Sequence, residues 1–240
     1  MLKNPKVLFI VHDVYQEDNS FPLGIAYLAA ALKKEGAEVK ICCQDISHLS
    51  NEALAESFLK NERYDLIGVG FLAARFEETI VGLCETINKF KKDAWLVLGG
   101  HGATPIADYV LERTKADIVT IGEAEETIVE LLKYKLEKGD LSQVKGIAWK
   151  SGDKVIINER RKMILDLDSI PFPEWSLFPM EKYTTCIKLF DAEKDDKTLG
   201  ILTGRGCFNS CNFCYRMEKG IRVRSIKSVV EEIKILNQKV

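Results

Sequence analysis

The stretch WLVLGGHGATP, residues 95–105, joins a short apolar run to a glycine-rich turn. Gly99, Gly100 and Gly102 permit positive φ angles and a close approach of the backbone to another group. Thr104–Pro105 is suited to begin a helix directly after the turn. A short apolar strand, a tight turn and a helix in this order are typical of a parallel sheet that helices cover on both faces.

The same alternation runs through the first 140 residues. Apolar runs predict five strands, at residues 7–11, 39–42, 66–71, 95–98 and 118–121. Amphipathic stretches predict helices near residues 23–35, 51–60, 76–91, 105–114 and 124–138. We therefore expect residues 1–140 to form a doubly wound α/β domain with five parallel strands.

The bulk composition excludes several classes of protein. Apolar residues make up 46% of the 240-residue chain, and the formal net charge of −2 predicts no nucleic-acid partner. No uncharged stretch reaches the roughly 20 residues that a membrane span needs, and His12 and Asp13 follow the first apolar run too soon for a signal peptide. Seven cysteines, an odd number without framework spacing, favour a reducing cytoplasm.

Two loops of the predicted domain are candidates for ligand binding, because such sheets bind ligands beyond the carboxyl ends of their strands. The glycine turn places His101 where a ligand would lie, although a tight turn with an exposed histidine explains it as well. After the fifth strand, Glu123 and Glu125 lie near the start of a helix, and the helix dipole alone could account for both carboxylates.

The rest of the chain is organised differently. Residues 146–158 predict a β-hairpin that turns at residues 151–153, and residues 165–179, with three prolines, predict an extended linker packed on a neighbour. We assign residues 141–197 to this hairpin and linker. Residues 198–240 predict one further unit, in which a strand at 198–203 precedes a cysteine-rich loop and a helix.

That loop has the spacing C-x3-C-x2-C, formed by Cys207, Cys211 and Cys214. Structural zinc needs four ligands, and the chain's three histidines all lie in the first domain. An iron–sulfur cluster is held by cysteine thiolates, and three of them leave one iron of a four-iron cluster open to another molecule. A zinc site that recruits a distant histidine, and clustering without a metal, remain the alternatives.

The motif GCFNSCNFC resembles the signature of radical S-adenosylmethionine enzymes. The resemblance implies that Cys207, Cys211 and Cys214 ligate a 4Fe-4S cluster and that Phe213 contacts the adenine of S-adenosylmethionine. In that family the open iron chelates S-adenosylmethionine, and an electron from the cluster cleaves it to a 5′-deoxyadenosyl radical. An external electron donor of the flavodoxin or ferredoxin type is implied as well.

Further motifs extend the resemblance over the whole chain, in the order FPLGIAYLAAALKKEG, GGHGATP, DIVTIGEAEET and LDLDSIPFPEW. Together they resemble radical S-adenosylmethionine proteins with a cobalamin-binding domain, such as magnesium-protoporphyrin ester cyclases and corrinoid-dependent methyltransferases. The resemblance implies a flavodoxin-like first domain. It places the following residues beside cobalamin: Gly99, Gly100, His101, Gly102, Ala103, Gly122 and Glu123. The D-x-H-x-x-G sequence that offers histidine to cobalt is absent, since His12 precedes Asp13, so no lower ligand is assigned.

We therefore expect the N-terminal part of a cobalamin-binding radical S-adenosylmethionine enzyme that performs methyl transfer or a radical rearrangement on an unknown small molecule. A six-unit partial barrel needs about 180 residues beyond the linker. The chain supplies about 40, so we expect an incomplete barrel that contains only its first βα unit, and no turnover by this chain alone. The alternatives are an enzyme of this class whose first domain does not bind cobalamin, and a non-catalytic corrinoid- or zinc-binding module.

Overall fold

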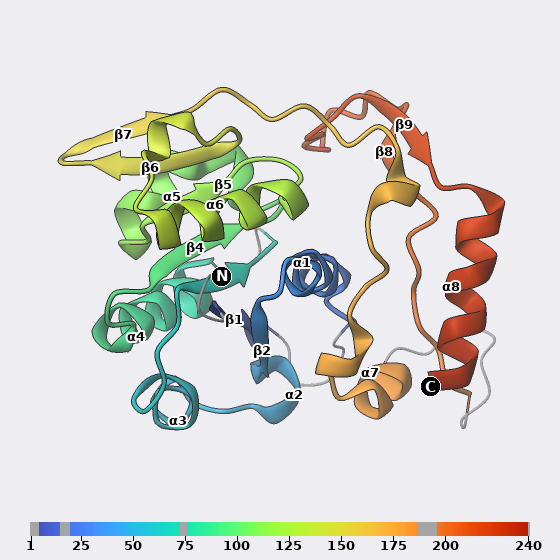
Figure 1. The fold of residues 1–240 in the computed structure, drawn as a ribbon, viewed down its shortest axis with the longest axis horizontal. Helices are drawn as coiled ribbons and strands as arrows, with labels where there is room; N and C mark the ends of the chain where they lie inside the picture. Colours follow the sequence, from blue (N-terminus) through green and yellow to red (C-terminus); the bar gives the residue numbers. More distant parts are fainter. Residues whose placement is uncertain (1–4, 15–19, 73–75, 187–195, 240) are drawn as a thin grey trace.

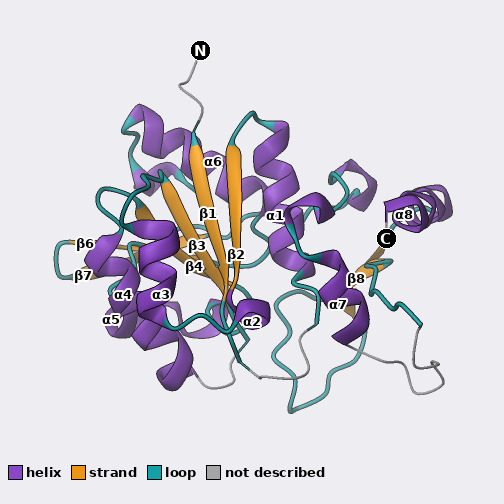
Figure 2. Cartoon of the chain, turned by 90° about the horizontal axis from the view of Figure 1, so that it is seen from below, coloured by secondary structure: helices purple, strands orange, loops and turns teal. Residues whose placement is uncertain are grey.

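A computed structural model describes residues 5–14, 20–72, 76–186 and 196–239. Its centre is a parallel sheet with the strand order β2-β1-β3-β4-β5, of which Figure 2 labels β1 to β4. The strands are β1 (Lys6–Val11), β2 (Glu38–Cys43), β3 (Leu66–Gly70), β4 (Trp95–Gly99) and β5 (Ile118–Thr120). This is the flavodoxin-like order, so the predicted doubly wound domain with five parallel strands is confirmed.

Two further strands extend the sheet beyond the prediction. β6 (Ile147–Ser151) pairs antiparallel with β5, and β7 (Lys154–Ile157) pairs antiparallel with β6, around the predicted hairpin turn. The hairpin therefore belongs to the same seven-stranded sheet instead of lying outside the domain. Ile147 and Ala148 are fully buried, so the hairpin covers the backbone edge that β5 would otherwise expose.

Helices cover both faces of the sheet. α1 (Leu23–Lys34) and α6 (Glu125–Glu137) pack on one face, together with the side chains of Val7 and Phe9. α3 (Asn51–Leu54), α4 (Gly82–Phe90) and α5 (Ala107–Thr114) pack on the other, where Leu8 and Ile10 contribute. Successive residues of a strand point to opposite faces, so a continuous apolar run in β1 supplies two cores at once. A short helix, α2 (Gln44–Ser47), follows β2.

Three of these helices adjoin a π-helical or 3-10 turn. A π-helical turn, Ala55–Leu59, continues α3, and another, Phe76–Val81, leads into α4. A 3-10 turn, Thr104–Ile106, with Pro105 in its first turn, leads into α5, as the Thr-Pro sequence predicts. Within the described residues, none of the helices combines the length and the apolar character that crossing a membrane requires.

The linker packs against the first domain, as predicted. Leu167, Ile170, Trp175 and Phe178 are buried along it, and α7 (Met180–Cys186) follows. The hydroxyl of Tyr183 on α7 donates to the Asp45 carboxylate at 2.9 Å. Residues 187–195, which precede the last part of the chain, lie outside the described residues.

The last part of the chain consists of β8 (Gly204–Cys207), β9 (Gly220–Val223) and α8 (Ile226–Lys239), and we call residues 204–239 the cysteine arm. In Figure 1 the arm lies beyond α1, at the side of the molecule away from β6 and β7. The strand predicted at 198–203 is wrong: residues 196–203 have no regular structure, and β8 begins at Gly204. β8 pairs antiparallel with β9, so the arm starts with a hairpin and not with a simple βα unit.

Candidate functional site

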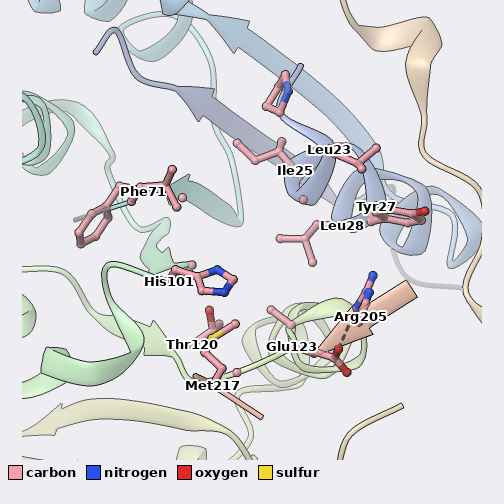
Figure 3. A pocket seen from close by; sticks show the side chains of 18 of the residues that line it. Leu23, Ile25, Tyr27, Leu28, Phe71, His101, Thr120, Glu123, Arg205 and Met217 are labelled. Atoms are coloured by element: carbon pink, nitrogen blue, oxygen red, sulfur yellow. Dashed lines mark ion pairs between the residues drawn. The ribbon is translucent and has the colours of Figure 1, made fainter. Parts of the chain in front are cut away.

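A cavity of about 980 Å³ lies where the parallel strands end, between the sheet, α1 and the cysteine arm (Figure 3). Its wall is mainly apolar, and side chains such as Leu23, Ile25 and Leu28 of α1 contribute to it. The switch in strand order between β1 and β3 opens onto this cavity, and such crevices are where doubly wound sheets bind ligands. Its volume is at the upper end of the range for small-molecule sites.

The glycine turn after β4 forms part of the wall. Gly99, Gly100 and His101 line the cavity, and Figure 3 shows the His101 ring near Thr120. Gly100 has φ of +95°, and a Cβ there would lie 2.9 Å from the backbone oxygen of Phe71, so only glycine fits without strain. The turn therefore lets the backbone itself form the surface that faces a ligand.

Gly102 and Ala103, the remaining predicted residues of this turn, do not line the cavity. Ala103 is fully buried, and a Cβ on Gly102 would lie 2.6 Å from the ring of Phe71. Both residues are buried and support the turn from the interior of the protein.

Thr104 joins the two glycine loops. Its hydroxyl donates to the Gly100 carbonyl at 3.0 Å and accepts from the Gly122 amide at 3.3 Å. Gly122, which has φ of +86°, and Glu123 both line the cavity. The loops after β4 and β5 are thus held side by side.

All three cysteines of the motif line the same cavity. Cys207, at the end of β8, and Cys214 are exposed, and Cys211 is half-buried. A four-iron cluster binds each thiolate through a different iron, and three thiols that line one cavity are a donor set of that kind.

Phe213, predicted to contact an adenine ring, does not line the cavity, and 88% of its surface is exposed.

Ion pairs hold the cysteine arm to the sheet domain. Both Nη atoms of Arg222 on β9 donate to the two carboxylate oxygens of Glu123, at 2.9 and 2.7 Å, and Arg205 on β8 lies 3.3 Å from Glu123. Burial alone would raise the pKa of Glu123, but the hydrogen bonds from Arg222 and the nearby guanidinium charges hold this pKa below its ordinary value. Glu123 therefore carries a negative charge that two arginines of the arm neutralise.

Arg205 is in addition fixed on two other sides. It pairs with Glu125 at the start of α6, and its guanidinium lies 5.3 Å from the ring centroid of Tyr27 on α1, within cation–π range. Sequence reasoning missed Arg205, Arg222 and Tyr27. For Arg205 the available signal was a charged residue between two glycines, two positions before Cys207.

Two titratable side chains that follow β1 and β2 line the cavity although they are buried. His12 and Asp45 both line the cavity, with 8% and 3% of their surfaces exposed. Burial raises the pKa of Asp45 to about 6, against the lowering effect of the Tyr183 hydroxyl. The ends of β1 and β2 thus present titratable side chains to the interior of the cavity.

A comparison with known families finds a match in the sheet domain. Residues 16–132 match the family model of the B12-binding domain. The match spans most of the sheet domain and includes the glycine loops after β4 and β5.

Curated relatives match over most of the chain. An uncharacterised methyltransferase of Pyrococcus horikoshii is 29% identical over 223 residues, which cover 90% of this chain and 46% of the relative. The anaerobic magnesium-protoporphyrin IX monomethyl ester cyclase of Cereibacter sphaeroides is 31% identical over 233 residues, which cover 90% of this chain and 35% of the relative. The chain therefore spans about half the length, or less, of these relatives.

A solved structure has a similar fold. The radical S-adenosylmethionine methyltransferase TsrM of Kitasatospora setae, solved with cobalamin and a 4Fe-4S cluster bound, superposes with a TM-score of 0.73 at 20% identity. The match covers 99% of this chain and 46% of that structure. The similarity therefore includes the linker and the cysteine arm as well as the sheet.

Proposed function

Because residues 16–132 match the model of the B12-binding domain, we propose that the cavity binds a corrinoid and that the cysteine arm holds an iron–sulfur cluster beside it. The chain would then act as the N-terminal part of a radical S-adenosylmethionine enzyme. The observation that supports this most strongly is that the glycine loops and the three cysteines, about 100 residues apart in sequence, line one cavity.

The two halves of the cavity suit the two cofactors. Gly99, Gly100 and Gly122 expose backbone to a large ligand, and the apolar side chains around them suit the edge of a corrin ring. On the cysteine arm, Cys207, Cys211 and Cys214, which line the same cavity, would hold the cluster and leave one iron without a protein ligand. When bound, the cluster would supply the electron that radical S-adenosylmethionine chemistry requires.

The side chains of the arm would position these groups. Arg205 and Arg222, anchored on Glu123 and Glu125, fix the cysteine loop against the corrinoid side of the cavity. Phe213, which is exposed next to Cys214, is our proposed contact for the adenine of S-adenosylmethionine. The apolar wall would exclude water from the space between the cofactors.

For the whole protein we propose methyl transfer, or another radical reaction, on a small molecule. The curated relatives named as a methyltransferase and as an ester cyclase support this class of reaction. An external electron donor of the flavodoxin or ferredoxin type would reduce the cluster. Because the chain spans about half the length of these relatives or less, the reaction is proposed for the whole protein and not for these 240 residues alone.

Anaerobic reconstitution with iron and sulfide tests the cluster. We expect about four irons per chain in the wild type, and loss of most of this iron in Cys211→Ala. The matched control is Cys84→Ala, which removes a buried thiol of α4 that does not line the cavity and should leave the iron content unchanged. One zinc per chain without sulfide, or equal iron in both variants, would contradict the proposal.

A further inference from the structure

His12, directly after β1, is a buried imidazole without a hydrogen-bond partner. Only 8% of its surface is exposed, and neither Nδ1 nor Nε2 has a partner in the part of the chain that the structure describes. The backbone of Gly70 lies nearby, but not in hydrogen-bonding geometry. An unpaired buried polar group destabilises a protein, so a partner that hydrogen-bonds His12 would be stabilising.

The location of His12 indicates where that partner lies. The residue lines the cavity at the carboxyl end of β1, next to β3, where the strand order switches. His12 is thus removed from bulk solvent but open to the space that a ligand would fill. A ligand in the cavity can therefore reach His12 as a hydrogen-bond partner.

The protonation state of His12 limits the chemistry of that ligand. Burial lowers the pKa of His12 to about 4, against the smaller raising effects of the Gly70 backbone and the Asp13 carboxylate. The Asp45 carboxyl group also lines this part of the cavity, and the Asp13 carboxylate is hydrogen-bonded to His48, with 2.7 Å between Oδ2 and Nδ1. At neutral pH the imidazole of His12 is uncharged and offers one N–H donor and one nitrogen acceptor.

A neutral imidazole can ligate a metal ion through its unprotonated nitrogen, or it can hydrogen-bond a group that accepts, donates or does both. A histidine that ligates a metal almost always donates its second N–H to a carboxylate, a carbonyl or water, which fixes the ring. His12 has no such protein partner in the described residues. The geometry therefore favours a hydrogen-bonding group over a metal ion, and a primary carboxamide, which both donates and accepts, can pair with either ring nitrogen.

We propose that His12 is a binding residue that hydrogen-bonds a peripheral carboxamide of the ligand in this cavity. The inference rests on the proposed function, because a corrinoid carries several primary carboxamides around its ring. His12 would then determine how the ring is oriented against β1 and would not touch the cobalt.

Cobinamide is the probe that tests this inference, because it keeps the ring carboxamides and lacks the nucleotide base. We expect His12→Leu to weaken cobinamide binding about tenfold, which corresponds to about 1.4 kcal/mol. His12→Gln, which keeps one donor and one acceptor, should bind within about threefold of the wild type. Without ligand, His12→Leu should resist urea at least as well as the wild type, because it removes an unpaired polar group.

Each other outcome overturns the inference in a recognisable way. Equal cobinamide binding by His12→Leu and the wild type rejects the role of His12 and leaves the corrinoid proposal standing. Failure of the wild type to bind cobinamide and cobalamin rejects both. Nitrogen hyperfine splitting in the paramagnetic resonance spectrum of bound cob(II)inamide, absent in His12→Leu, would make His12 a cobalt ligand. A ligand-free His12→Leu chain that is less stable than the wild type would assign the imidazole a structural role.

Discussion

The sheet domain and the cysteine arm are stabilised by different forces. The sheet domain buries apolar side chains on both faces, and Ile67 and Leu96 have no exposed surface. The arm leaves Ile226 85% exposed and Val223 71% exposed, and its contacts with the rest of the chain include several ion pairs and hydrogen bonds. The corrinoid half of the proposed site thus belongs to a packed core, whereas the cluster half depends on charged contacts.

The largest expected effect follows from the same substitution made in both regions. Ile67→Ala removes a fully buried side chain of β3 and should lower the free energy of unfolding by about 2–5 kcal/mol. Ile226→Ala removes an exposed side chain of α8 and should change it by less than about 0.5 kcal/mol. Urea denaturation followed by circular dichroism measures both. Similar losses in the two variants would show that the arm has a packed core as well.

Acid should affect the sheet domain through His12 and Asp45 in opposite directions. The pKa of His12 is lowered to about 4, so the unfolded chain takes up the proton first and stability is lost as the pH falls from 6.5 to 4. The pKa of Asp45 is raised to about 6, so the folded chain takes up the proton first and stability is gained as the pH falls from about 6 to 3.8. The two effects largely cancel in the wild type.

His12→Leu removes only the loss of stability that protonation of His12 causes. Relative to the wild type, this variant should gain up to about 3 kcal/mol of stability between pH 7 and pH 4, because the pKa of His12 is about 4 in the folded chain and 6.5 in the unfolded chain. Urea midpoints at a series of pH values measure the difference. Parallel pH profiles of the two proteins would show that folding does not lower the pKa of His12.

The smallest effect concerns the attachment of the arm. Glu123→Gln keeps the shape of the side chain and removes the charge that pairs with Arg205 and Arg222, so docking of β8 and β9 should weaken by on the order of 1 kcal/mol. Hydrogen exchange of the β8 and β9 amides should then become several times faster. The matched control is Glu159→Gln, which breaks the exposed pair with Lys145 and should leave this exchange unchanged. Equal exchange rates in all three proteins would mean that other contacts hold the arm.

The same division explains what the sequence could predict. The parallel strands and the glycine turn after β4 depend on local patterns, and the structure confirms them. The place of the hairpin was missed, because its pairing with β5 depends on an edge that no local pattern describes. The strand predicted at 198–203 was wrong: Leu202 packs beside the buried Leu167 and Ile170 of the linker, and apolar character without strand pairing produced the pattern.

The polar contacts of the site could be predicted least. Glu123 was expected beside a cofactor, and it does line the cavity, but its carboxylate also binds Arg222, which is 99 residues away in sequence. The cysteine spacing identified the three thiols but gave no information about which part of the fold they would face. Partners this distant in sequence leave no local signal on either side.

Corrinoid binding by cavity-filling variants tests the central claim most directly. Gly24 lines the cavity, and a Cβ there would meet no atom within 4 Å, so Gly24→Leu can fold and still occupy the space of the ligand. Gly200 is equally unobstructed but does not line the cavity, so Gly200→Leu is its control. In equilibrium titration with hydroxocobalamin, we predict that the wild type and Gly200→Leu bind one corrinoid per chain. Gly24→Leu should bind at least tenfold more weakly, which corresponds to a loss of roughly 1.4 kcal/mol in binding free energy. Equal binding by Gly24→Leu and Gly200→Leu, or none by the wild type, would contradict the assignment of this cavity to a corrinoid.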